Sequence, residues 1–137
     1  MLRCFYLKSP SASDGTGEGA AFIRHSEGSC EYQLVDMVTS KDSHADQRWT
    51  GANDIVASVH THPAWSVDPI THRVTLIGPE PSRPTSSDPR GDVLAAKSYK
   101  IPFYVLTDRY VWVAYPDGTT KDVINQFPGW AGSKYEQ

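Results

Sequence analysis

The feature that most constrains the fold is an apolar run, residues 55–59, that ends in His60-Thr61-His62-Pro63. Apolar and β-branched residues of this density predict a buried strand. In a strand, residues i and i+2 point to the same face, so His60 and His62 can converge on one point. Pro63 has no backbone N–H to donate and therefore ends the ladder. The run thus predicts a core strand that carries two imidazoles at its C-terminal end.

The other patterns predict a mainly antiparallel, curved sheet with one or two packed helices, which is an α+β fold. We expect a first strand at residues 1–7 and a hairpin whose arms are 18–23, headed by Glu18, and 30–38. This hairpin directly precedes the histidine strand, so the three are expected to be neighbours. Further strands are expected at 103–106, 110–114 and 120–124.

One helix is predicted after the long proline-rich segment 64–84, which shows no clear period. Asp88 is a typical N-cap residue, Pro89 is favoured at the first helical position, and Pro102 stops the helix. A loop as long as 64–84 inside a compact domain is usually functional or disordered.

Length and composition predict one domain spanning 1–137, with a core at 18–124 and a tail at 125–137. The chain is 39% apolar and 21% charged, with a formal charge of −3, which is typical of a soluble protein and leaves its compartment open. Basic residues are scattered, which argues against nucleic-acid binding, and no apolar run approaches the ~20 residues of a membrane span. Cys4 and Cys30 are predicted to be small buried residues, although a disulfide between them stays open.

Asp88 also offers a third ligand for a metal held by His60 and His62. A catalytic zinc takes three protein ligands and a water, whose pKa it lowers to about 7. A carboxylate must then carry the proton of that water to the leaving amine, and Glu18 is the candidate because its strand is expected to pair near the histidines. Thr85, three residues before Asp88, is the candidate donor to the oxyanion.

Glu18, His60-Thr61-His62-Pro63 and Thr85-Ser86-Ser87-Asp88 together resemble the signature of the JAB/MPN/Mov34 metallopeptidases, the JAMM motif. The resemblance implies a cytidine-deaminase-like JAB/MPN fold and zinc-dependent cleavage of a peptide or isopeptide bond. The two histidines and the aspartate would hold Zn²⁺, the glutamate would act as general base and acid, and the residue at the serine position would stabilise the oxyanion.

The resemblance is greatest to the bacterial branch associated with toxins and effectors. It implies a peptide, protein or peptidoglycan-like substrate, secretion or cytoplasmic action as part of a larger effector, and an immunity or inhibitor protein as partner. The alternative function is a non-catalytic JAMM-like module that binds protein.

Several residue assignments stay open. Ser82 and Ser86 are alternatives to Thr85, because threonine adds a stiff β-branch at the serine position. Asp92 is less favoured than Asp88 as a ligand, since no hydroxyl residue stands three positions before it.

The general base and the substrate contacts also have alternatives. Glu27 and Glu31 are rivals of Glu18. Trp65 and Ser86, which flank the proposed ligands in the sequence, are candidates for substrate binding.

Overall fold

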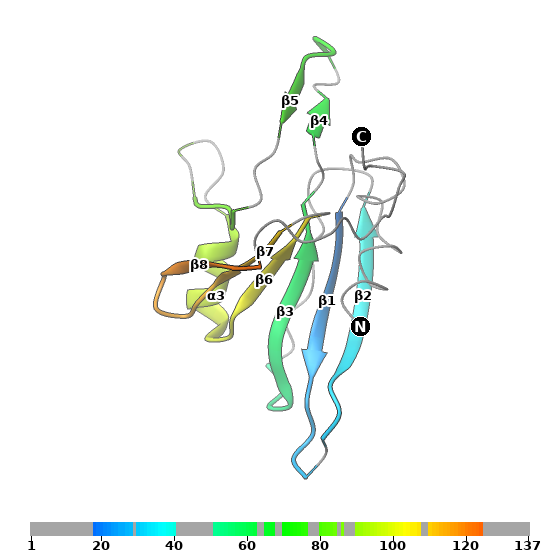
Figure 1. Ribbon diagram of the computed structural model, residues 1–137, viewed down its shortest axis with the longest axis vertical. Helices are drawn as coiled ribbons and strands as arrows, with labels where there is room; N and C mark the ends of the chain where they lie inside the picture. Colours follow the sequence, from blue (N-terminus) through cyan, green and yellow to red (C-terminus); the bar gives the residue numbers. More distant parts are fainter. Residues whose placement is uncertain are drawn as a thin grey trace.

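The computed structural model of the protein contains an open six-stranded sheet with a helix packed against it (Figure 1). The structure describes residues 18–28, 30–40, 51–62, 65–67, 70–76, 80–84, 86, 90–107 and 110–124. Within these ranges, no helix is long and apolar enough to cross a bilayer.

The strand order in the sheet is β2-β1-β3-β6-β7-β8, and every neighbouring pair is antiparallel except β3 and β6, which are parallel. The strands are β1 (Glu18–Arg24), β2 (Gln33–Ser40), β3 (Ile55–Thr61), β6 (Phe103–Leu106), β7 (Val111–Ala114) and β8 (Thr120–Ile124). Parallel neighbours need a crossover connection, and the helix α3 (Asp92–Tyr99) lies in the connection between β3 and β6.

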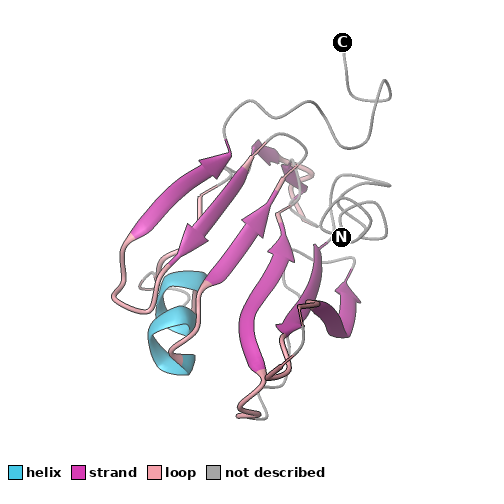
Figure 2. Ribbon diagram, turned by 60° about the horizontal axis from the view of Figure 1, so that its bottom comes forward, coloured by secondary structure: helices cyan, strands magenta, loops and turns pink. Residues whose placement is uncertain are grey.

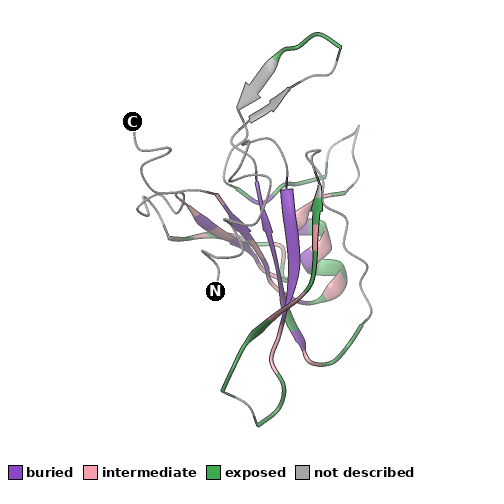
Figure 3. Ribbon diagram, turned by 90° about the vertical axis from the view of Figure 1, so that its right-hand side faces the viewer, coloured by how far each residue is buried: buried purple, intermediate pink, exposed green. Residues whose placement is uncertain are grey.

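The sheet has apolar side chains on both faces because residues alternate between them along each strand. The helix α3 lies against one face of the sheet (Figure 2). There Val93 and Ala96 pack in a cluster that includes Phe22 and Phe103. The opposite face carries a second buried cluster, made of Ala21, Ile23, Ala57, Val59, Leu106 and Val111. The central strands are accordingly buried along most of their length (Figure 3).

The α+β class, the largely antiparallel sheet and the adjacency of β2, β1 and β3 are confirmed. The strands predicted at 103–106, 110–114 and 120–124 correspond to β6, β7 and β8. The segment predicted as a loop at 64–84 also contains a small antiparallel ribbon, β4 (Trp65–Val67) and β5 (Val74–Leu76), which stands apart from the main sheet in Figure 1.

Two predictions were wrong. The helix begins at Asp92 with Gly91 as its N-cap, so Asp88 does not cap it. Cys30 lies outside the strands and is an exposed free cysteine rather than a buried one. The strand predicted at 1–7, the tail 125–137, Cys4, Thr85 and Asp88 lie outside the described residues.

Candidate metal centre

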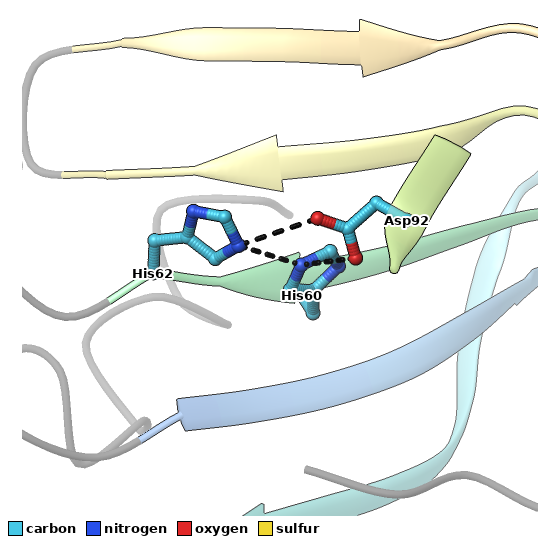
Figure 4. Close-up of side chains that lie close together, drawn as sticks. All are labelled: His60, His62 and Asp92. Atoms are coloured by element: carbon cyan, nitrogen blue, oxygen red, sulfur yellow. Dashed lines mark hydrogen bonds and ion pairs between the residues drawn. The ribbon is translucent and has the colours of Figure 1, made fainter. Parts of the chain in front are cut away.

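His60 and His62 stand at the C-terminal end of β3 and face the start of α3 (Figure 4). Both are buried, with 8% and 7% of their surface exposed. Their Nε2 atoms lie 3.1 Å apart. The expected convergence of two side chains at positions i and i+2 is therefore confirmed, and it occurs at the end of a strand that the core holds on both faces.

Asp92, the first residue of α3, completes the group. Its Oδ1 lies 3.0 Å from His60 Nε2, and its Oδ2 lies 3.4 Å from His62 Nε2. The three side chains come from two elements that are far apart in the sequence, and the packing of α3 on the sheet brings them together. Among the described residues, they form the one group of three or more histidines, cysteines or acids close enough to hold a metal ion.

The spacing of these atoms fits a single metal ion. Ligand atoms that each lie about 2.0–2.2 Å from one ion are roughly 3.0–3.6 Å from one another in the usual coordination geometries. The two Nε2 atoms are 3.1 Å apart, and each approaches a different oxygen of the Asp92 carboxylate, Oδ1 at 3.0 Å from His60 and Oδ2 at 3.4 Å from His62. Two imidazole nitrogens and a carboxylate are also a common donor set for zinc and for other divalent transition metals.

The electrostatics of the centre keep the carboxylate ionised. Burial by itself raises the pKa of Asp92, but its electrostatic interactions and hydrogen bonds with His60 and His62 outweigh burial and hold this pKa well below the usual value. An ionised carboxylate is the form that ligates a metal. Asp92 is therefore already in the protonation state that binds a cation.

Ser82 holds the Asp92 carboxylate in place. The backbone N–H of Ser82 donates to Asp92 Oδ2 at 2.7 Å, and its hydroxyl donates to the same oxygen at 2.9 Å. In return, the backbone N–H of Asp92 donates to Ser82 Oγ at 3.1 Å, and that of Val93 donates to the Ser82 carbonyl at 3.1 Å. We call these four hydrogen bonds the Ser82–Asp92 clamp; such partners of a metal ligand orient it and raise its affinity for the metal.

The clamp requires a glycine at position 91. Gly91 has φ 150° and ψ 160°, a backbone conformation that is essentially restricted to glycine. A Cβ added there would lie 3.0 Å from the Ser82 carbonyl oxygen and 3.2 Å from the Pro84 nitrogen. The chain therefore passes so close to residues 82–84 that only a residue without a side chain fits.

Glu18 is buried at the start of β1, with 8% of its surface exposed. Because Ala20 is paired with His60 in the antiparallel β1–β3 register, Glu18 falls opposite His62 and on the same face. Glu27 and Glu31 are exposed residues beyond the other end of β1, where Arg24 pairs with Ile55. The length of β1 separates them from the histidines by about 20 Å at ~3.4 Å per residue.

The structure thus brings together His60, His62 and the strand end bearing Glu18, as expected, and adds Asp92, which the sequence disfavoured. Asp88 and Thr85 lie outside the described residues. Ser82 was one of the predicted alternatives to Thr85, but its pairing with Asp92 was missed because it stands ten positions before that aspartate rather than three.

The substrate-binding roles of Trp65 and Ser86 stay predictions. Trp65 begins β4, and Ser86 is exposed.

No protein-family model matches this chain, and no curated protein or solved structure matches it either. The functional argument therefore depends on the geometry of the centre and on the residues that form it.

Proposed function

We propose that the protein is a zinc-dependent hydrolase that cleaves an amide bond, either a peptide or an isopeptide bond, in the manner of the JAMM metallopeptidases. The observation that carries the proposal is the convergence of His60 Nε2 and His62 Nε2, which are 3.1 Å apart, on the Asp92 carboxylate, whose Oδ1 lies 3.0 Å from His60 and whose Oδ2 lies 3.4 Å from His62. Structural zinc sites take four protein ligands, whereas catalytic sites take three and keep a position for water. Within the part of the chain that the structure describes, the group has three ligands, and this number favours catalysis.

Zinc bound by these residues would supply a water of lowered pKa and would polarise the carbonyl group of the substrate. The same donor set also suits Fe²⁺ in oxygenases, so the identity of the metal is part of the proposal. The acid opposite His62 favours hydrolysis, because amide cleavage needs a proton carrier close to the metal.

Glu18 is the proposed proton carrier. It would accept the proton of the attacking water and donate it to the leaving nitrogen, as a general base and then a general acid. Its burial beside the histidines supports this role, and the exposed positions of Glu27 and Glu31 at the far end of β1 argue against theirs.

Ser82 is the proposed hydroxyl residue of the site. Its Oγ lies 2.9 Å from Asp92 Oδ2 and donates to it. To donate to the oxyanion that forms when the carbonyl group is attacked, the hydroxyl would turn away from Oδ2, which would keep the hydrogen bond from the Ser82 backbone N–H.

The resemblance to the toxin- and effector-associated branch extends the proposal to biological context. It favours a peptide, protein or peptidoglycan-like substrate and an immunity or inhibitor protein that blocks the site. The JAB/MPN fold is proposed on the same basis.

The test combines metal analysis with hydrolysis of a fluorescence-quenched peptide library. We expect about one zinc per chain in the purified protein, loss of zinc in His60→Ala and His62→Ala, and chelator-sensitive hydrolysis. Glu18→Gln should abolish hydrolysis and keep the zinc, whereas the matched variant Glu31→Gln should behave as wild type.

Iron in place of zinc, or a metal content that neither histidine affects, would contradict the proposal. Zinc binding without hydrolysis of any library member would favour the non-catalytic protein-binding module instead.

A further inference from the structure

The residue between the two histidines has a contact that bears on Glu18. We propose that Thr61 is a positioning residue that fixes Glu18 at the metal centre through the backbone amide of Gly19. This proposal rests on the proposed function, since it assigns to Thr61 the placement of the general base.

The contact is a buried hydrogen bond between two strands. The backbone N–H of Gly19 donates to Thr61 Oγ1 at 2.9 Å, and Thr61 is completely buried. Because side chains alternate along β3, the Thr61 side chain points away from the face that carries His60 and His62. Thr61 therefore acts on the neighbouring strand and not on the metal ligands.

Glu18 is the first residue of β1, at the end of the strand that lies beside the histidines. Gly17 and Gly19 flank it in the sequence, and glycine has the largest conformational freedom of any residue. The β1–β3 register pairs begin only at Ala20, opposite His60. The Thr61 hydrogen bond continues the attachment of β1 to β3 past that pair, up to the residue next to Glu18.

On its other side, the start of β1 is attached to an edge strand. Glu18 and Gly19 pair with Ser40 and Thr39 of β2, which forms one edge of the sheet. The end of an edge strand is a poor anchor because only one neighbour holds it. The hydrogen bond to Thr61 joins the start of β1 directly to β3, the strand that bears the histidines.

The hydroxyl is the essential part of Thr61. Valine has nearly the same shape but offers no acceptor, so Thr61→Val would leave the buried Gly19 amide without its partner. A catalytic group displaced by about 1 Å can lose roughly 100-fold in rate. Thr61→Val should therefore slow the chemical step and leave metal binding unchanged.

The experiment compares four zinc-loaded full-length proteins: wild type, Thr61→Val, Thr61→Ser and Thr39→Val. Thr61→Ser keeps the hydroxyl. Thr39→Val is the matched control, because Thr39 is the exposed register partner of the same glycine on β2. The readouts are zinc affinity, hydrogen exchange of the Gly19 amide by NMR, and kcat and KM on the most reactive member of the quenched peptide library.

For Thr61→Val we expect Gly19 amide exchange at least about 10-fold faster, kcat about 10–100-fold lower, and an unchanged KM and zinc affinity. Thr61→Ser should restore both the exchange rate and kcat, and Thr39→Val should match wild type. If Thr61→Val does not fold, Thr61→Ala makes the same comparison, and the Gly19 amide of wild type must still be protected from exchange.

Three results for Thr61→Val would contradict the proposed role of Thr61: a kcat equal to that of wild type, a Gly19 amide that exchanges as slowly as in wild type, or loss of zinc. The last would mean that Thr61 supports the histidines instead. A wild-type protein that hydrolyses nothing would refute the proposed function, and the exchange of Gly19 would still decide whether Thr61 holds its amide.

Discussion

Replacing Gly91 by alanine tests whether the Ser82–Asp92 clamp prepares the metal centre. An added Cβ would lie 3.0 Å from both the Ser82 carbonyl oxygen and the Arg83 carbonyl carbon. These are backbone atoms, so the contact can be relieved only by moving residues 82–84 away from Gly91. The φ of 150° adds strain of about 1–3 kcal/mol for any residue with a side chain.

We therefore expect Gly91→Ala to weaken both the fold and the site. Stability should fall by about 2 kcal/mol or more from strain and overpacking together, which is roughly 6–10 °C in Tm for a domain of this size. Zinc affinity should fall by about 10–100-fold, because Asp92 loses the partners that orient its carboxylate. The assays are thermal unfolding of the zinc-free protein and competition for zinc with a chromophoric chelator.

Gly28→Ala is the matched control. Gly28 also has a positive φ, 80°, but nothing lies within 4 Å of an added Cβ. Its substitution should cost about 1–2 kcal/mol of stability and leave zinc affinity unchanged. If Gly91→Ala binds zinc as tightly as Gly28→Ala does, the clamp does not prepare the site and the reasoning is refuted.

Three further predictions address the same centre. Asp92→Ala should lower zinc affinity by more than about 100-fold, because loss of a ligand costs more than the roughly 10–100-fold that loss of a ligand's hydrogen-bond partner costs. Asp88→Ala should bind zinc as wild type does. Equal losses in the two variants would mean that both aspartates contribute. Ser82→Ala should lower zinc affinity about 10-fold by chelator competition, with the exposed Ser86→Ala unchanged. In zinc-free protein, the lowered pKa of Asp92 stabilises the fold at pH values above the ordinary aspartate pKa of about 3.9, and this stabilisation is lost as the pH falls through the lower pKa of the folded state. When urea unfolding is measured from pH 5 to pH 2, the free energy of unfolding should therefore fall less steeply in Asp92→Asn than in wild type.

The strands were predictable because their signals are local. The run before His60 and the alternation in β2 appear directly in the sequence, and the positions of β6, β7 and β8 follow from apolar segments separated by turns. The parallel pairing of β3 with β6 was not predictable in this way, because it depends on where α3 packs. The ribbon β4–β5 was missed since two three-residue strands are too short to show a period.

The predicted start of the helix was wrong because the prediction used a local N-cap preference, whereas the observed start depends on tertiary hydrogen bonds. An N-cap aspartate followed by proline contributes about 1 kcal/mol, and this favoured a start at Asp88. The actual start at Asp92 gains the four hydrogen bonds of the clamp. The sum of these interactions exceeds the preference of one cap.

The same difference between local and tertiary signals explains why the histidines were predictable as candidate ligands and Asp92 was not. The relation between His60 and His62 is set within one strand by the two-residue period of the backbone, so the sequence contains it in full. The relation between the hydroxyl and the carboxylate is set in space, by a clamp whose members stand ten residues apart. Because the clamp joins residue 82 directly to residue 92, the length of chain between them does not enter the geometry of the centre. A rule that counts three positions back from an aspartate therefore finds Thr85 and Asp88, whereas a rule that asks which hydroxyl can reach a carboxylate facing the histidines finds Ser82 and Asp92.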